Sequence, residues 1–412
     1  YANQEQIQWP GRTKGSRGMI PHYGVISGIK DIPQPNSLEL VPYVLAGQTQ
    51  SDESNQEANL GLDLRYNINS STTLNMTFNP DFGQVEADPS VLNLSAFETR
   101  LDEKRPFFVQ GANFFNSWLN MFNSRRIGRR PSFIEPSTGD IIDRPNETTI
   151  LSAAKILGQT SSGVKYGVIN ALTNEEFGTR EYDIDGETKR EKFLVEPFAN
   201  YFVGRATKPI INELSAIGFM TTDLKRNGFK DIARSFKGDW LINLLDNKLV
   251  FTGEVGTTIN DAETGFGGRY RVSYRNPVLW EFVTWGGFLD DKWNVSAMGF
   301  QQKNNNWYSG ARLSLRRDQP KGVFINQNLN FRLWISGLHN GLLTRNNFEI
   351  ESENRFTNYW RFGFQVELNP QTYVDDDIYR DSRAVIIKDE AWQEYNIWFS
   401  SDTRKNFVIR PW

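Results

Sequence analysis

The feature that most constrains the fold is a strict alternation of apolar and polar residues. It is clearest at residues 60–68, where leucine, tyrosine or isoleucine takes every second position and glycine or polar residues lie between them. Successive side chains of a β-strand point to opposite faces, so this run predicts a strand with one apolar and one polar face. The pattern resumes at residues 74–79 after Ser70 and Ser71, which predicts a β-hairpin.

The same alternation returns in the second half of the chain, with arginine frequent on the polar face. It is found at residues 269–275, 311–316, 325–335 and 360–368. Pairs that favour turns separate the runs, namely Ser162-Gly163, Asn227-Gly228, Asp246-Asn247, Asp290-Asp291 and Asn340-Gly341. At about ten residues for each strand, with a turn in addition, the length predicts on the order of 16 to 20 strands or more.

An apolar face that persists through so many strands favours an all-β fold of one kind, a large transmembrane antiparallel β-barrel. In such a barrel the outer surface is apolar over about 25 Å and the interior is polar. The chain is 38% hydrophobic and 13% aromatic, and no apolar run approaches the roughly 20 residues of a transmembrane helix. A soluble β-sandwich or propeller is the alternative, although no repeat of fixed period supports a propeller.

Composition excludes several function classes. There is no cysteine, hence no disulfide and no cysteine nucleophile, which suits an oxidising compartment. The 46 basic and 49 acidic residues give a net charge of −3, so there is no basic field for nucleic acid and none is expected as a partner. The expected location is the outer membrane of a Gram-negative bacterium, with outer-membrane lipid as a partner and without cofactor or metal.

The alternation is interrupted between residues 79 and 116. Asn79-Pro80 and Asp88-Pro89 favour turns. Residues 90–104 have apolar residues at helical spacing, which predicts a helix that Pro106 ends. A charged, irregular stretch is costly where it faces lipid, so residues 79–116 must lie in the lumen, in a periplasmic layer or at an extracellular rim. An internal plug or constriction is the favoured prediction.

The charged residues of this stretch have two interpretations. The carboxylates could bind a hard cation or act as an acid/base pair, but their spacing is not that of an EF-hand loop. The favoured interpretation is that they pair with basic residues, including Arg125-Arg126 and Arg129-Arg130, and so hold the plug. The candidate plug residues are Asp81, Glu86, Asp88, Glu98, Glu103, Lys104 and Arg105.

Six arginines on the polar face are the candidate lining of a lumen, on strand phase alone. They are Arg65, Arg269, Arg271, Arg312, Arg332 and Arg361. The alternative for each is an ion pair within the barrel wall, for example to Asp63 or Glu367. Several aromatic residues near predicted strand ends, such as Trp285, Trp293 and Tyr308, form interfacial girdles or else ordinary cross-strand contacts.

Several motifs carry a resemblance to a known family. They are LELVPYV at residues 38–44, NPDFGQVEADPSVLNLSAFET at 79–99, EKRPFFVQGANFF at 103–115 and SRRIGR at 124–129. Weaker ones lie at residues 150–163, 196–205 and 400–405. With these motifs the chain resembles the outer-membrane β-barrel region, a domain of unknown function, of carbohydrate-binding-module family 9 domain-containing proteins of Bacteroidota-type bacteria.

The resemblance implies a domain organisation. Residues 1–36 would be the linker from an N-terminal sugar-binding-type domain, and residues 37–412 the barrel. The family barrel extends further, so the resemblance implies a barrel truncated at Trp412.

Three functions are compatible with these sequence features. The first is passage or binding of a polar ligand such as a glycan through a polar, arginine-rich lumen. The second is a structural or assembly scaffold in an outer-membrane complex for secretion or surface-protein export, with a lipoprotein or other subunits as partners. The third, a membrane-embedded glycan hydrolase, is weakly supported, because the chain has only two histidines, His22 and His339, and no GxSxG or HExxH motif. No catalytic residue is assigned, and the chain is not expected to be an enzyme.

Overall fold

The computed structural model describes residues 23–24, 26–28, 37–50, 54–80, 93, 97–131, 139–184, 187–229, 232–261, 263–276, 278–374 and 387–411. Most of these residues lie in β-strands, and the largest element is one sheet of sixteen strands. Every pair of neighbouring strands in this sheet is antiparallel. The prediction of an all-β chain with a large antiparallel sheet is therefore confirmed.

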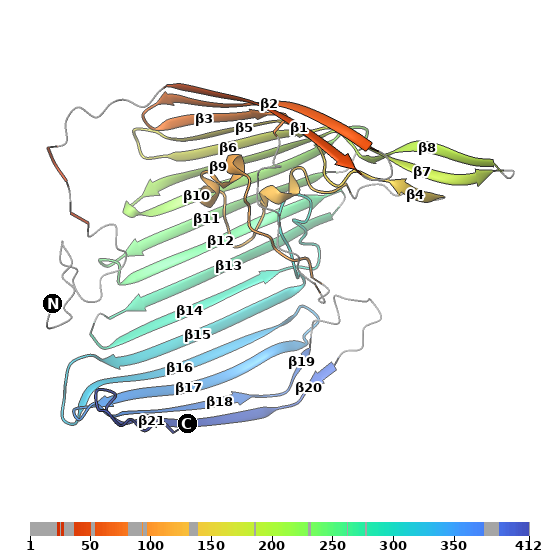
Figure 1. The fold of residues 1–412 in the computed structure, drawn as a ribbon. Coiled ribbons are helices and arrows are strands. Elements are labelled where there is room, and N and C mark those ends of the chain that lie inside the picture. Colours follow the sequence, from red (N-terminus) through yellow and green to blue (C-terminus); the bar gives the residue numbers. More distant parts are fainter. Residues whose placement is uncertain are drawn as a thin grey trace.

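Sequence order and sheet order agree almost throughout (Figure 1). The strands, in their order across the sheet, are β1 (Leu38–Gln50), β2 (Ser54–Asn69), β3 (Thr72–Phe78), β5 (Ile150–Gln159), β6 (Lys165–Thr173), β9 (Ala199–Ile210), β10 (Asn212–Arg226), β11 (Ala233–Leu244), β12 (Leu249–Asn260), β13 (Glu263–Arg275), β14 (Trp280–Leu289), β15 (Asn306–Arg317), β16 (Phe324–Leu338), β17 (Leu343–Phe356), β18 (Arg361–Asn369) and β21 (Trp392–Ser400). Within the described residues no pairing joins β21 back to β1, so closure of a barrel stays a prediction.

The predicted hairpin and turn residues coincide with strand ends in the structure. Strands β2 and β3 pair as the predicted hairpin, with Arg65 opposite Asn75. Asp246-Asn247 joins β11 to β12, and Asn340-Gly341 joins β16 to β17. Both residues of the first pair have positive φ, as does Gly341, which is the left-handed conformation that asparagine, aspartate and glycine adopt most readily.

The two faces of the sheet differ sharply in chemistry. We call the face that residues 97–131 cover the inner face and the opposite one the outer face. On the central strand β12, Glu254 points inward and is 4% exposed, whereas its neighbour Val255 points outward and is 52% exposed. Exposed apolar side chains on the outer face are Leu60, Val168, Phe202, Ile217, Phe219, Val255, Phe266, Tyr270, Phe282, Phe288, Leu315, Leu333, Phe362, Tyr395, Ile397 and Phe399. An apolar surface of this extent is unusual for a protein face that meets water.

Aromatic rings lie across glycines of the neighbouring strand in several places. Trp398 of β21 covers Gly363 of β18, and Trp285 of β14 covers Gly310 of β15, so a Cβ at either glycine would overlap the indole ring. Such pairs fix strand register, because the ring fits only where the opposite residue has no side chain.

A layer of irregular structure, the inner segment (residues 97–131), lies against the inner face. It holds three short helices, α1 (Pro106–Val109), η2 (Ala112–Phe114) and η3 (Ser124–Arg126), drawn in front of the sheet in Figure 1. The loop of residues 290–305 between β14 and β15 packs beside it, since Asn123 N–H donates to the carbonyl of Met298. No helix among the described residues is long and apolar enough to cross a bilayer.

Two predictions about this region were wrong. Residues 97–104 are not helical, and Pro106 begins helix α1 instead of ending a helix. Proline favours the first helical position because its fixed φ suits the helix and its missing N–H would have no helical partner there. The break in the large sheet also extends beyond residue 116, since β5 begins only at Ile150.

A second, small sheet projects from the end of the large one (Figure 1). We call it the arm; it consists of β4 (Asp140–Asp143), β7 (Glu176–Ile184) and β8 (Glu187–Glu196) in the order β4-β7-β8. Strands β19 (Thr372–Val374) and β20 (Ile387–Asp389) pair separately near the same end.

The aromatic residues proposed as girdles do not form one group. Trp293 is 1% exposed and lies in the core of the 290–305 loop, so it cannot be interfacial. Trp285 and Tyr308 lie on the inner face, because β-register places them in line with the inward residue Arg269. The girdle interpretation was wrong for these three residues.

Candidate functional site

The inner segment is held first by an apolar contact layer. Phe108, Phe115 and Ile127 are buried in one cluster with Ile169 and Val203 of the sheet. Leu119 and Met121 form a second cluster with Trp293 and Val295 of the 290–305 loop. The sheet residues in these clusters point inward. The apolar contact layer therefore lies on the inner face, which the sequence pattern predicts to be polar.

Glycines let the backbone of the segment, the loop and the sheet come close to one another. At Gly265 of β13 a Cβ would overlap the backbone of Lys292 and Trp293, and at Gly299 of the 290–305 loop it would overlap the carbonyl of Asn120. A Cβ at Gly167 would meet the rings of Phe114 and Phe115. The glycines therefore allow the segment and the loop to pack closely against the sheet.

A buried carboxylate, Glu254, lies at the centre of the contact between segment and sheet. Its Oε1 accepts the backbone N–H of Trp118 at 2.8 Å, and its Oε2 lies 2.9 Å from Nζ of Lys237. Both charged side chains are almost fully buried, at 5% and 1% exposed. The Nε of Arg269 lies 3.3 Å from Oε1. A buried charge is tolerated when it is paired and hydrogen-bonded in this way.

The indole ring of Trp118 contacts two inward side chains. The guanidinium of Arg269 lies 5.3 Å from its centroid, and the ring of Tyr308 lies 5.8 Å away. Arg269 thus contacts both the Trp118 ring and the carboxylate that binds the Trp118 backbone. A cation over an indole face is the favourable geometry for a cation–π contact.

The same network extends to strand β9. Arg205 donates from Nη1 to the carbonyl of Asn116 at 2.9 Å and pairs with Asp239 at 3.1 Å, while Lys237 also contacts Asp239 at 2.9 Å. Four sheet strands, β9, β11, β12 and β13, therefore contribute charged groups that fix residues 116–118. We call Arg205, Lys237, Asp239, Glu254 and Arg269 the anchor network.

A second anchor is Lys155 of β5. Its side chain is 99% buried, and its ammonium donates to the carbonyls of Phe107 and Gln110, the latter at 2.6 Å. These carbonyls belong to the end of helix α1, where carbonyl groups lack helical partners and the helix dipole favours a cation.

Within the segment, the motif residues bind one another. Glu103 pairs with Arg105 at 2.7 Å and accepts the hydroxyl of Ser124 at 2.6 Å. Arg105 also donates to the carbonyls of Ser124 and Ile127, each at 2.7 Å. Burial by itself would raise the pKa of Glu103, but the hydrogen bonds and charge of Arg105 and the Ser124 hydroxyl together hold it below its ordinary value.

Arg126 connects three parts of this layer. It pairs with Glu98 through Nη1 at 2.9 Å, and its Nε donates to the carbonyl of Gly299 at 2.8 Å. The segment is thus tied to its own first residues and to the 290–305 loop by one buried guanidinium, whose planar fork suits a carboxylate and a carbonyl at once.

A cavity of about 380 Å³ lies between the helices of the segment and the sheet. Phe108, Phe115 and Phe122 give it an apolar side, and Gln110, Asn113, Asn116 and Asn123 give it a polar side. Its volume falls within the range of small-molecule sites.

The predicted plug residues divide into two groups. Asp81, Glu86 and Asp88 lie outside the described residues. Glu98, Glu103 and Arg105 form the ion pairs given above, and the N–H of Lys104 donates to Glu103 at 3.1 Å. The ion pairs of these described residues join one part of the segment to another and do not reach the sheet.

The strand registers place all six predicted arginines on the inner face. Arg269 belongs to the anchor network, Arg312 lies 3.6 Å from Glu281, and Arg332 pairs with Glu349 at 2.7 Å. Among the described residues Arg65, Arg271 and Arg361 have no ion pair, and neither Asp63 nor Glu367 is an arginine partner.

Beyond the segment, the inner face of β16 to β21 is a ladder of amides and carboxylates. Asn347 donates to Glu367 at 2.6 Å, Gln365 to Glu349 at 3.3 Å, and Asn330 to Glu351 at 3.3 Å. Trp334 lies on the same face and meets Trp285 edge to face at 5.8 Å. No group of three potential metal-ligating side chains occurs in the part of the chain that the structure describes.

Comparison with known proteins identifies the family. Residues 34–411 match the family described as Domain of unknown function (DUF5916). The chain belongs to this family. The match contains every strand of the sixteen-stranded sheet together with the inner segment and the arm, so the anchor network is part of the family domain. No curated protein matches the sequence.

Three solved structures are distantly similar. FpvA of P. aeruginosa bound to heterologous pyoverdines has a TM-score of 0.27 at 9% identity, over 89% of this chain and 62% of that one. The FpvAI–pyocin S2 complex gives 0.26 at 10% identity, over 89% and 60%, and the unliganded ferric citrate transporter FecA gives 0.25 at 9%, over 89% and 66%. The chain thus spans about three fifths to two thirds of these proteins, and similarity at this level transfers no residue roles.

Most of the anchor network carries no motif in the sequence. Arg205, Lys237, Asp239 and Glu254 of the network, and the second anchor Lys155, were not predicted as site residues. The available signal was weak. Lys155, Arg205 and Glu254 are single charges in inward positions whose neighbours two residues away are small or apolar, as in Ala153-Lys155-Leu157, whereas Lys237 and Asp239 are neighbours of opposite charge on one strand. These residues have the pattern of an exposed polar face, and they are buried where the inner segment covers them.

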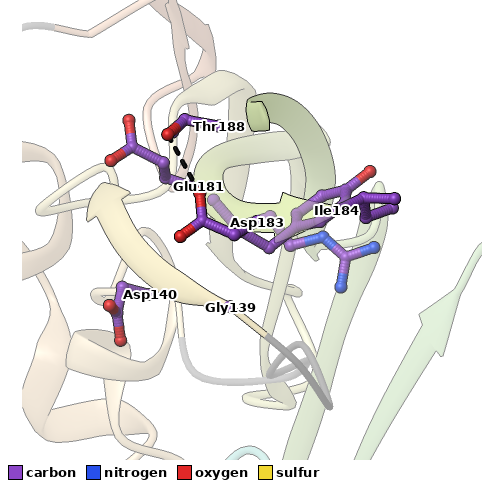
Figure 2. A pocket seen from close by; sticks show the side chains of 8 residues that line it. Gly139, Asp140, Glu181, Asp183, Ile184 and Thr188 are labelled. Atoms are coloured by element: carbon purple, nitrogen blue, oxygen red, sulfur yellow. Dashed lines mark hydrogen bonds between the residues drawn. The ribbon is translucent and has the colours of Figure 1, made fainter. Parts of the chain in front are cut away.

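A separate pocket lies on the arm, lined mainly by β7 residues. Figure 2 shows Glu181 and Asp183 beside Thr188, whose hydroxyl donates to Asp183 at 2.9 Å, with Asp140 of the neighbouring strand β4 and Gly139 just before it. Glu181 pairs with Arg190 and Arg180 pairs with Glu191, which ties β7 to β8. The carboxylates of Glu181 and Asp183 are thus already engaged within the arm.

Proposed function

We propose that the chain is an outer-membrane β-barrel protein whose polar interior, narrowed by the inner segment, binds or passes a polar ligand such as a glycan. The observation that carries this proposal is the opposition of the two faces, with exposed Val255 on one side of β12 and buried Glu254 on the other. An apolar outer face matches lipid, and a charged inner face matches an aqueous interior. The ion pair of Arg234 with Asp223 on the outer face lies near the strand ends, where charge costs less.

The inner face of β14 to β21 supports the ligand class. Carboxylates and amides offer acceptors and donors to hydroxyl groups, and Trp334 offers an aromatic surface to the apolar faces of sugar rings. Binding, and not catalysis, is the activity that we propose.

The proposal also includes a narrower group within the family. We propose a place among carbohydrate-binding-module family 9 domain-containing proteins of Bacteroidota-type bacteria, with a sugar-binding domain elsewhere in the full protein. The motifs at residues 79–99 and 103–115 support it.

The anchor network favours one alternative, a scaffold whose interior is sealed. Residues 116–118 are held by charged groups from four strands, which suits a permanent seal as well as a fixed constriction. Partners would then be a lipoprotein or other subunits of an outer-membrane complex.

Conductance measurements separate the two functions. The full-length protein, purified from outer membranes and inserted in planar bilayers, should give discrete current steps that maltotriose reduces. Trp334→Leu should weaken the effect of maltotriose, whereas Trp360→Leu, at an exposed turn, should not. A protein that inserts yet passes no current and binds no oligosaccharide is a scaffold, and the ligand proposal would be abandoned.

A further inference from the structure

The connections at the two ends of the large sheet differ systematically in length. At one end, on the left in Figure 1, residues 70–71, 160–164, 245–248, 276–279, 318–323 and 357–360 join the strands, and Ile211 alone joins β9 to β10. At the other end are the long connections, residues 79–149, 174–198, 290–305 and 370–391, with a few short ones among them. Every long insertion is thus at one end.

The free ends of the two outermost strands, β1 and β21, lie at the same end of the sheet. Leu38, the first residue of β1, is paired with Tyr66 near the 70–71 turn, and Ser400, the last residue of β21, is paired with Arg361 beside the 357–360 turn. The chain therefore enters the first strand and leaves the last strand at the end that carries the short turns.

Outer-membrane barrels have short turns on the periplasmic side and longer loops outside. We infer that the end with the long connections faces the cell exterior. This inference rests on the proposed outer-membrane location. It assigns the arm, the 290–305 loop and the β19–β20 pair to the extracellular side.

The orientation also determines where the inner segment comes from. Strand β3 ends at Phe78 and β5 begins at Ile150, both at the exterior end, and the N–H of Asn79 donates to the carbonyl of Leu151 at 2.8 Å. The 79–149 connection therefore starts and returns at the extracellular rim. The segment is therefore part of an extracellular connection that folds inward, and both ends of this connection join strands at the extracellular rim.

This arrangement has a functional consequence. A ligand that arrives from outside meets the arm and the segment before it reaches the inner face of β14 to β21. The segment can change the opening only by moving relative to the rim or the anchor network, because the strands that flank the connection, β3 and β5, end and begin at the rim. The exposed charges of the arm, such as the Arg190–Glu181 pair, suit a position in water beyond the membrane.

Cysteine labelling tests the orientation directly, since the chain contains no cysteine of its own. Thr188→Cys places a thiol on the arm, and Ser71→Cys and Ser162→Cys place one on short turns; all three residues are exposed. Each variant of the full-length protein is expressed in a Gram-negative host and treated with a polyethylene-glycol maleimide too large for porins. Labelling in detergent-denatured samples checks that each thiol reacts.

We expect Thr188→Cys to be labelled on intact cells, and the two turn variants only after the outer membrane is opened. The reverse pattern in a protein that fractionates with the outer membrane would overturn the orientation but leave the proposed function standing. No labelling of Thr188→Cys on intact cells would also overturn it. Labelling of all three variants on intact cells, or absence from the outer-membrane fraction, would defeat the membrane proposal itself.

Discussion

Glu254 of strand β12 accepts the backbone N–H of Trp118 at 2.8 Å, although the two residues are 136 positions apart in the sequence. The bond joins the inner segment to the sheet, and Arg269 contacts the carboxylate and the Trp118 ring together. The position of the segment thus depends on one buried carboxylate whose own charge is balanced by Lys237.

Removing the charge of Glu254 should destabilise the fold. In Glu254→Gln the buried ammonium of Lys237 keeps only its ion pair with Asp239, and losing one member of a buried pair costs about 3–5 kcal/mol. Urea unfolding in lipid bilayers measures this loss in the free energy of unfolding. The double variant Lys237→Met/Glu254→Gln should recover part of it, and exposed Glu263→Gln should change little. Equal effects of Glu254→Gln and Glu263→Gln would contradict the role of the network.

A side chain at Gly265 should displace the 290–305 loop. In Gly265→Val the new atoms overlap the backbone of Lys292 and Trp293, and overpacking of this kind typically costs about 1–3 kcal/mol. Trypsin should then cut faster after Lys292, which mass spectrometry of the fragments detects. Gly238→Ala is the matched control, because its Cβ would meet its nearest neighbour at 3.9 Å. Unchanged cleavage in Gly265→Val would show that the loop does not rest on this strand.

The packing of the inner segment should weaken in acid through Glu103. Its pKa is lowered in the folded protein, so the stabilisation is complete above the ordinary value of 4.5 and is lost as the pH falls through the lower folded value. Wild-type stability should therefore decline below about pH 4.5 more steeply than that of Glu103→Gln. Unfolding followed from pH 7 to pH 3 measures the difference, with Glu147→Gln as an exposed control. Parallel curves for wild type and Glu103→Gln would rule out this contribution.

A charge on the outer face should be costly only if that face meets lipid. Val255 lies in the middle of β12, and an arginine at the bilayer midplane of a barrel costs about 2–4 kcal/mol. Val255→Arg should therefore lower the free energy of unfolding in bilayers, while Val278→Arg, in the 276–279 connection, should be tolerated. If Val255→Arg is as stable as wild type in bilayers, the outer face is not lipid-facing.

The sequence by itself determined the strands and their faces. The alternation at residues 60–68 and 269–275 became β2 and β13, and Asp246-Asn247 became a turn, because the period of side chains along a strand and the backbone preferences of turn residues are local properties. The six predicted arginines share a face for the same reason.

Only the tertiary structure decided which of those polar residues are buried. Lys155 and Glu254 follow the same alternation as the exposed Arg271, and they differ from it because the inner segment contacts their charged groups. The path of that segment depends on contacts between residues far apart in the chain, such as Trp118 with Glu254 and Arg126 with Gly299. Desolvation is a property of the assembled fold, so a local pattern that predicts a polar face cannot say where on that face a charge leaves water.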